Sequence, residues 1–133
     1  MKFPTAQEIA DVRIDQKLAA QKVADARRQE EEERRRGYSQ EVGRAASRIM
    51  SIAPGLISAA VAKGRNGILI GWGHRDAAVY CTAIIDMPKL DREPTKDIVA
   101  ILMTSVPEHI QVYASQWHDG GGMHGGPAVG FTF

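Results

Sequence analysis

Residues 27–36 read Arg-Arg-Gln-Glu-Glu-Glu-Glu-Arg-Arg-Arg, and this stretch decides the architecture of the N-terminal part of the chain. Three of its four glutamates stand four residues before an arginine, the spacing and orientation that stabilise a helix by about 0.2–0.5 kcal/mol per pair. The stretch carries no apolar side chain, so a helix here offers nothing to a hydrophobic core. The sequence therefore predicts a charged helix whose purpose is spacing or packing against a partner.

The same helix is expected to begin near Thr5. Thr5 and Glu8 form a capping-box pattern, in which the side chain of each residue can bond the backbone amide of the other. No Gly or Pro interrupts the chain between Thr5 and Gly37, which predicts a helix nearly 50 Å long at about 1.5 Å per residue. Because glycine commonly ends helices, we expect a helical arm over residues 1–37 and a compact domain over residues 38–133.

A second helix is expected after Ser39. Its apolar residues follow alternating steps of four and three, which is typical of a helix with one buried face: Val42, Ala46, Ile49, Ala53, Leu56 and Ala60. Pro54 lies inside this run and removes a backbone hydrogen bond, so the helix is expected to be kinked there. Gly64 is expected to end it.

The remainder of the chain predicts a small sheet with one further helix. Residues 67–72 are typical of a buried strand, and residues 77–85 are expected to be its hairpin partner. The alanines of residues 77–85 leave a helix as the alternative. Residues 95–105 predict a short helix, whereas 109–117 and 128–133 alternate as strands. The expected class is α+β with the order α-α-β-β-α-β-β, the helices packing on a mainly antiparallel sheet.

The composition excludes several classes of protein. A net charge of +1 gives no global field that attracts nucleic acid, which is not an expected partner. Cys81 is the single cysteine, so neither an intrachain disulfide nor a cysteine-based zinc cluster can form. The first residues do not resemble a signal peptide, and no run approaches the roughly 20 apolar residues that cross a bilayer. We therefore expect a cytoplasmic protein without a membrane partner.

The glycine-rich residues 120–126 formally match the dinucleotide fingerprint G-x-G-x-x-G, but the helix that this motif requires cannot follow. A plain connection between two antiparallel strands is the first interpretation. The alternative is a site for a small anionic or nucleotide-like ligand, because exposed backbone amides can cradle an anion and an indole can stack on a base. Its candidate residues are Trp117, His118, Gly121, Gly122 and His124, with Trp72 and His74.

Metal binding and catalysis have little support in the sequence. His118, Asp119 and His124 include metal-ligand types, but a glycine-rich loop does not hold them rigidly. Neither a metal nor a cofactor is therefore predicted. No nucleophile elbow, phosphate-binding loop, H-E-x-x-H or C-x-x-C motif occurs, so no catalytic residue is assigned.

The layout of a long charged leader helix followed by a compact unit that ends on a strand resembles small accessory proteins of tailed phages. This resemblance implies a virion component or an inhibitor of a host system, located in the host cytoplasm or in the virion. The leading hypothesis is a non-enzymatic binding or assembly module that pairs with itself, as a dimer or a multiple of dimers, or with another protein. Its expected interface residues are Ile9, Val12, Val23, Val42, Ile49 and Leu56. The alternative is a small-ligand-binding protein or enzyme with its site at residues 117–126.

Overall fold

The computed structural model describes residues 2–73, 76–121 and 124–133. His74 and Gly122, two of the candidate ligand residues, lie outside these described residues. By its internal contacts the chain divides into two units, Met1–Gly37 (the arm) and Tyr38–Phe133 (the body). The helix α1 (Ala6–Ala62) contributes residues to both units.

The start and the end of α1 follow from local chemistry. The Glu8 amide donates to the Thr5 hydroxyl oxygen at 3.1 Å, as the capping pattern predicts. At the other end Gly64 adopts a φ of 74°, and the Arg65 amide donates to the Ala60 carbonyl oxygen at 2.9 Å. These bonds satisfy carbonyl groups that the last helical turn leaves without partners.

The expected helix end at Gly37 is wrong. The helix α1 continues through Gly37, where an added Cβ would meet no atom within 4 Å and where φ is not positive. Glycine costs a helix only about 1 kcal/mol, and the helix-forming residues on both sides outweigh that cost. Pro54 also lies within α1, as expected.

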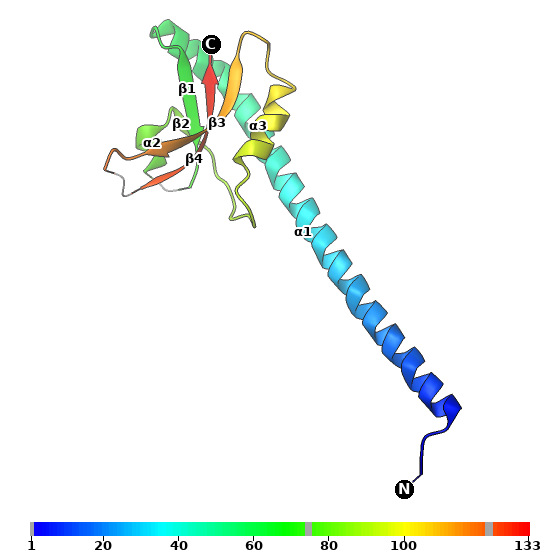
Figure 1. Cartoon of the computed structure of the whole chain (residues 1–133). Coiled ribbons are helices and arrows are strands. Elements are labelled where there is room, and N and C mark those ends of the chain that lie inside the picture. The colour runs from blue at the N-terminus through cyan, green and yellow to red at the C-terminus, as the bar shows by residue number, and fades with distance from the viewer. Residues whose placement is uncertain (1, 74–75, 122–123) are drawn as a thin grey trace. The chain divides into compact units, whose positions relative to one another are not determined.

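The body is built on a four-stranded mixed sheet with the order β2-β1-β4-β3, shown in Figure 1. Strand β4 (Gly125–Thr132) pairs antiparallel with both β1 (Gly67–Gly71) and β3 (Gln111–His118). The short strand β2 (Ala83–Ile84) pairs parallel with β1. The α+β class is confirmed. With α1 counted as the two expected helices and α2 set aside, the elements also follow the expected order.

The segment 77–85 differs from the expected hairpin strand. Its first part forms the one-turn helix α2 (Ala77–Tyr80), and only β2 is extended. A hairpin would make β2 antiparallel to β1, whereas a chain that crosses over through α2 returns parallel. The alanines that left a helix open in the sequence lie in this turn.

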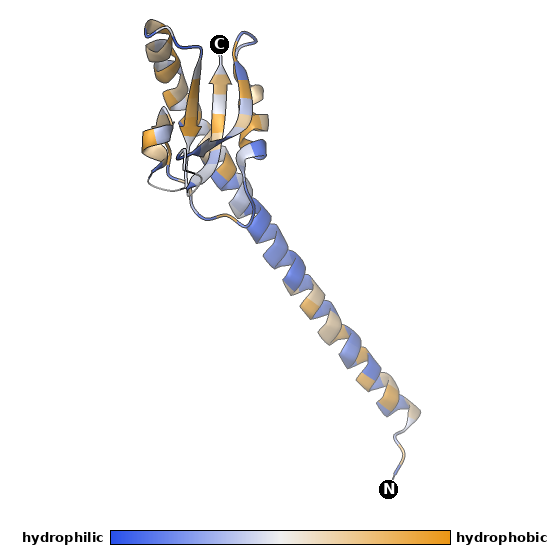
Figure 2. Ribbon diagram, turned by 60° about the vertical axis from the view of Figure 1, so that its left-hand side comes forward, coloured by the Kyte–Doolittle hydropathy of each residue, from blue (hydrophilic) through white to orange (hydrophobic). Residues whose placement is uncertain are grey.

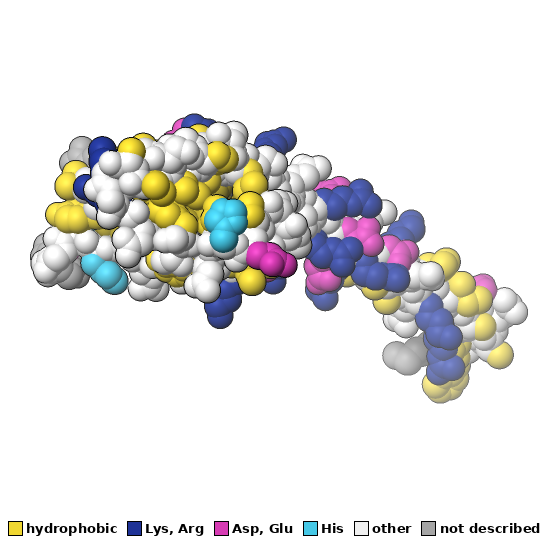
Figure 3. Space-filling view, turned by 90° about the horizontal axis from the view of Figure 1, so that it is seen from above, with side chains coloured by type: hydrophobic (Ala, Val, Ile, Leu, Met, Phe, Trp, Pro, Cys, Tyr) yellow, Lys and Arg dark blue, Asp and Glu magenta, His cyan; other side chains and the backbone are white. Residues whose placement is uncertain are grey.

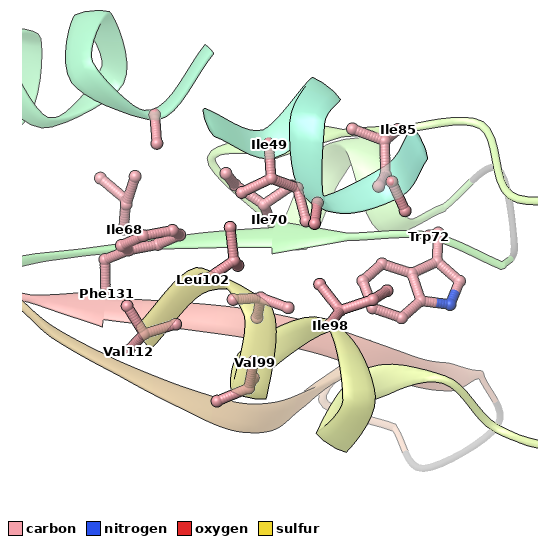
Figure 4. Packing of buried hydrophobic residues seen from close by; sticks show 14 of the residues in the cluster. Ile49, Ile68, Ile70, Trp72, Ile85, Ile98, Val99, Leu102, Val112 and Phe131 are labelled. Atoms are coloured by element: carbon pink, nitrogen blue, oxygen red, sulfur yellow. The ribbon is translucent and has the colours of Figure 1, made fainter. Parts of the chain in front are cut away.

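One face of the sheet carries the main hydrophobic core. The second half of α1 and the helix α3 (Thr95–Met103) supply the covering side chains, among them Ile49, Ile98 and Leu102, each fully buried. They pack on Ile70 and Phe131 of the sheet, as Figure 4 shows. This arrangement explains the regular apolar spacing of residues 42–60, which is the core face of α1.

The hydropathy of α1 changes along its length, as Figure 2 shows for the hydrophilic tract of the arm. One 18-residue window of α1 has a mean hydropathy of 1.4, with 28% of the window buried, and is long and apolar enough to cross a membrane by composition alone. This finding corrects the expectation that no segment reaches that threshold. Core helices of soluble proteins pass the same test, and the buried side chains of α1 pack in the body's core.

Candidate functional site

Trp117 occupies the face of the sheet opposite the main core. Its side chain is 1% exposed and packs with Ala77 of α2 and Ala128 of β4 in a small second cluster. The Tyr80 ring stacks on the indole, with 6.2 Å between ring centroids and 5° between the planes. The indole is therefore covered within the chain and does not present a free face on which a base could stack.

Trp72 is also buried, at 5% exposure, but its ring belongs to the main core on the other face, next to the Ile98 side chain in Figure 4. Trp117 and Trp72 meet only through a hydrogen bond from the Trp117 indole Nε1 to the Trp72 carbonyl oxygen, at 3.1 Å. The structure thus brings the side chain of Trp117 to the backbone of Trp72. Their rings do not form a common binding surface.

Glycines make room for the Trp117 indole. A Cβ on Gly126 would lie 2.8 Å from the indole Nε1, and a Cβ on Gly71 would lie 3.1 Å from the indole Cδ1. Both distances are shorter than ordinary van der Waals contact. Gly126, which the sequence suggested as part of a ligand loop, therefore has a packing role beside Trp117.

The loop from Asp119 to His124 is organised by its own carboxylate. Asp119 accepts hydrogen bonds from the amides of Gly121 and His124, each at 3.0 Å. The Asp119 amide donates in turn to the His124 carbonyl oxygen at 3.1 Å. An anion would have to compete with the Asp119 carboxylate for these two amides.

His118 and His124 have exposed side chains at the ends of β3 and of this loop. Within residues 2–73, 76–121 and 124–133, no group of three or more His, Cys, Asp or Glu side chains is placed to hold a metal ion. Cys81 is half-buried, and this burial raises the pKa of its thiol above the usual value, which disfavours the reactive thiolate.

An open depression of about 450 Å³ lies beside His118, between β3 and the start of α3. His118, Gly125 and Gly126 line one side of it, and Glu93 and Lys96 line the other. Glu93 already accepts a hydrogen bond from the Thr95 amide at 2.9 Å. Of the predicted ligand residues within the described chain, only His118 reaches this depression.

The predicted interface residues fall into two groups. Ile9, Val12 and Val23 of the arm are 40%, 54% and 54% exposed. Val42 and Ile49 are buried in the core of the body, and Leu56 packs against that core. Only the three arm residues therefore present a surface to a partner.

The whole arm shares this exposure, since every residue from Lys2 to Gly37 is exposed. Its apolar side chains interrupt a surface of dense charge, and Figure 3 shows these hydrophobic and charged regions. Ile14 and Leu18 are 55% and 52% exposed, which is comparable to Val12 and Val23. The arm thus keeps several large apolar side chains in solvent within a single chain.

A cluster that the sequence did not reveal lies at the beginning of the body. The Tyr38 hydroxyl donates a hydrogen bond to the Asp97 carboxylate, and the Arg92 guanidinium lies 4.4 Å from the centre of the Tyr38 ring. Arg92 and Asp97 are 3.7 Å apart. Partial burial and the bond to Asp97 raise the pKa of Tyr38. Tyr38 is distant in sequence from Arg92 and Asp97, and no spacing rule connects it to them.

Comparisons of the chain with models of protein families, with curated proteins and with solved structures gave no match.

Proposed function

We propose that this protein is a non-enzymatic assembly module that associates with further copies of itself through the helical arm. The observation that carries the proposal is the exposure of Ile9, Val12, Ile14, Leu18 and Val23, each between 40% and 55%. A helix with charge pairs at suitable spacing does not need these apolar side chains for its own stability. Removing them from water stabilises an association by roughly 25 cal/mol per Å² of apolar surface.

The arrangement of the predicted ligand residues favours assembly over a small-ligand site. The Trp117 ring is buried beneath Tyr80, and two amides of the glycine-rich loop are bonded to Asp119. By contrast, no residue of the arm from Lys2 onward is buried. If the resemblance to accessory proteins of tailed phages extends to function, the assembly is a virion component or an inhibitor of a host system.

Sedimentation equilibrium of the full chain tests this proposal. The wild-type protein is expected to have the mass of a defined oligomer. The variant Val12→Asp/Leu18→Asp/Val23→Asp changes only exposed side chains and is expected to sediment as a single chain. Gln21→Asp, which adds the same charge at an exposed polar side chain away from Val12 and Val23, provides the control. A wild-type protein that sediments as a single chain at all accessible concentrations would overturn the proposal.

A further inference from the structure

The apolar residues of the arm lie on two sides of the helix. Ile9, Val12 and Val23 follow heptad spacing together with Gln16, Ala19 and Ala26, so these six residues form one line, the arm seam. At about 100° per residue, Ile14 and Leu18 lie on the other side of the helix. Ile14 and Leu18 are therefore apolar and exposed like the arm seam but do not belong to it.

A parallel pairing of two arm seams in register is disfavoured by charge. The heptad positions that follow Ala26 on the same line are Glu30 and Glu33. In a parallel pair each of these carboxylates would face its own counterpart across the seam, with Glu31 and Glu32 nearby. Like charges at facing seam positions oppose such a pairing.

An antiparallel pairing removes this conflict and matches the side chains by size. With Gln16 of one copy opposite Ala19 of the other, Val12 lies opposite Val23 and Ile9 lies opposite Ala26. Ile9 and Gln16 thus each face an alanine, which allows the helix axes to approach closely. The paired segment, residues 9–26, would be about 26 Å long at ~1.5 Å per residue.

The charges of the arm match the same antiparallel register. Residues 8–15 contain three acidic side chains and one arginine, whereas residues 22–28 contain three basic side chains and one aspartate. Antiparallel pairing places the acidic part of each copy beside the basic part of the other. Asp15 and Lys22 both flank the arm seam and would face each other twice in the pair, once on each side of the two-fold axis.

We propose that residues 9–26 of the arm bind the same residues of a second copy of this chain as an antiparallel helix pair, with Gln16 opposite Ala19. This inference rests on the proposed function, because it assigns the partner and the orientation of the assembly. It is independent of Ile14 and Leu18, which remain outside the seam.

Site-directed cross-linking of the full chain tests the orientation. In a Cys81→Ala background, Val12→Cys and Val23→Cys are prepared separately and also co-expressed as differently tagged chains. In a glutathione redox buffer, the co-expressed pair is expected to form a disulfide-linked dimer that joins the two different chains. Each variant alone is expected to form much less, since its two cysteines lie about 16 Å apart along the antiparallel pair, at ~1.5 Å per residue. Gln21→Cys is the control for random collision.

The outcomes separate the orientation from the assembly itself. Strong cross-linking of Val12→Cys with itself, or no cross-linking in an intact oligomer, would overturn the antiparallel register and leave the proposed function standing. A wild-type chain that sediments as a single copy would overturn both. A second measurement uses Val12→Asp and Leu18→Asp: the first is expected to weaken association at least tenfold, whereas the second leaves it unchanged. Equal effects would contradict the arm seam.

Discussion

The indole Nε1 of Trp117 donates a hydrogen bond to the carbonyl oxygen of Trp72, 3.1 Å away, and this bond connects the two hydrophobic clusters of the body. It satisfies the only polar group of an indole that is 1% exposed. Buried polar groups are nearly always satisfied in this way. The bond therefore assigns Trp117 a structural role.

Replacing Trp117 by Phe is expected to destabilise the body by about 1–3 kcal/mol, because the hydrogen bond and part of the buried ring are lost together. Urea unfolding monitored by far-ultraviolet circular dichroism measures the change. Tyr113→Phe serves as the control, because the Tyr113 side chain is 41% exposed and the substitution removes only its hydroxyl group. If Trp117→Phe were neutral in stability while association persisted, the ligand interpretation of Trp117 would regain support.

Two glycines of β4 are expected to lose different amounts of stability when they are replaced by alanine. The glycine whose added Cβ would lie closer to its nearest atom is expected to lose less. A Cβ on Gly130 would lie 2.2 Å from Cζ of the half-exposed Tyr113 ring, which can swing away. A Cβ on Gly126 would lie 2.8 Å from the buried indole of Trp117 and 3.1 Å from the Trp72 carbonyl oxygen, neither of which can easily move. Gly126→Ala is therefore expected to cost about 1–3 kcal/mol, and more than Gly130→Ala.

The double variant Gly130→Ala/Tyr113→Ala checks the reason for that difference. If the Tyr113 ring is the only obstacle at Gly130, the glycine substitution should cost less in the Tyr113→Ala background than in the wild type. Thermal unfolding of the four proteins gives this comparison. Equal costs in both backgrounds would show that the strand itself resists the substitution.

The stability of the body is expected to depend on Tyr38 at alkaline pH. The pKa of Tyr38 in the folded protein is raised above 10.0, first by burial and then by the hydrogen bond to Asp97. The stabilisation is therefore fully present below the unfolded pKa of about 10 and is lost as the pH rises through the folded pKa. The difference in free energy of unfolding between the wild type and Tyr38→Phe should therefore shrink as the pH rises from the unfolded pKa through the folded pKa of Tyr38.

Absorbance at the phenolate band supplies the measurement. Subtracting the alkaline titration of Tyr38→Phe from that of the wild type isolates the Tyr38 curve, whose midpoint is expected above 10. Asp97→Asn removes one of the groups that raise the pKa and is expected to shift the midpoint down. A Tyr38 midpoint at or below 10 would contradict the contacts with Asp97.

Gly37 is expected to be the weakest point of the exposed part of α1, because residues 6–36 contain no other glycine and no proline, and glycine is the poorest helix former after proline. Gly37→Ala should stabilise the helix locally by up to about 1 kcal/mol, since no atom lies within 4 Å of the added Cβ. Limited trypsin digestion reports the change as slower cleavage after Arg34 and Arg35, two bonds whose following residue is the same in every variant. Gly37→Pro should accelerate the same cleavage, and equal rates for all three proteins would contradict a continuous helix.

Much of the fold follows from local patterns in the sequence. The cap at Thr5 and the end at Gly64 involve interactions within one or two helical turns, and the core face from Val42 to Ala60 is visible as a regular apolar spacing. The break expected at Gly37 was wrong because a single glycine cannot overcome two strong flanking helices. The parallel pairing of β2 depends on α2, which buries only Ala77 and leaves no periodic signal.

The candidate site was less accessible to sequence reasoning. Alternation along β3 separates Val112 from Trp117 onto opposite faces of the sheet, but it does not show that Tyr80 covers the second face. The role of Asp119 in the loop was also missed, although an aspartate immediately before glycines is a common signal for bonds to following amides. The exposure of residues 27–36, in contrast, was predictable from their charge alone.

The central position of β4 in the sheet has a consequence for the order of events during synthesis. Strands β1 and β3 both pair with β4, which is the last of the strands to leave the ribosome. The body cannot complete its sheet before residues 125–132 emerge, whereas the helix of the arm needs only local contacts and is made first. If the arm binds a second copy as proposed, neighbouring ribosomes on one messenger RNA would present arms to each other while their bodies are still unfolded, so the choice of partner would precede folding.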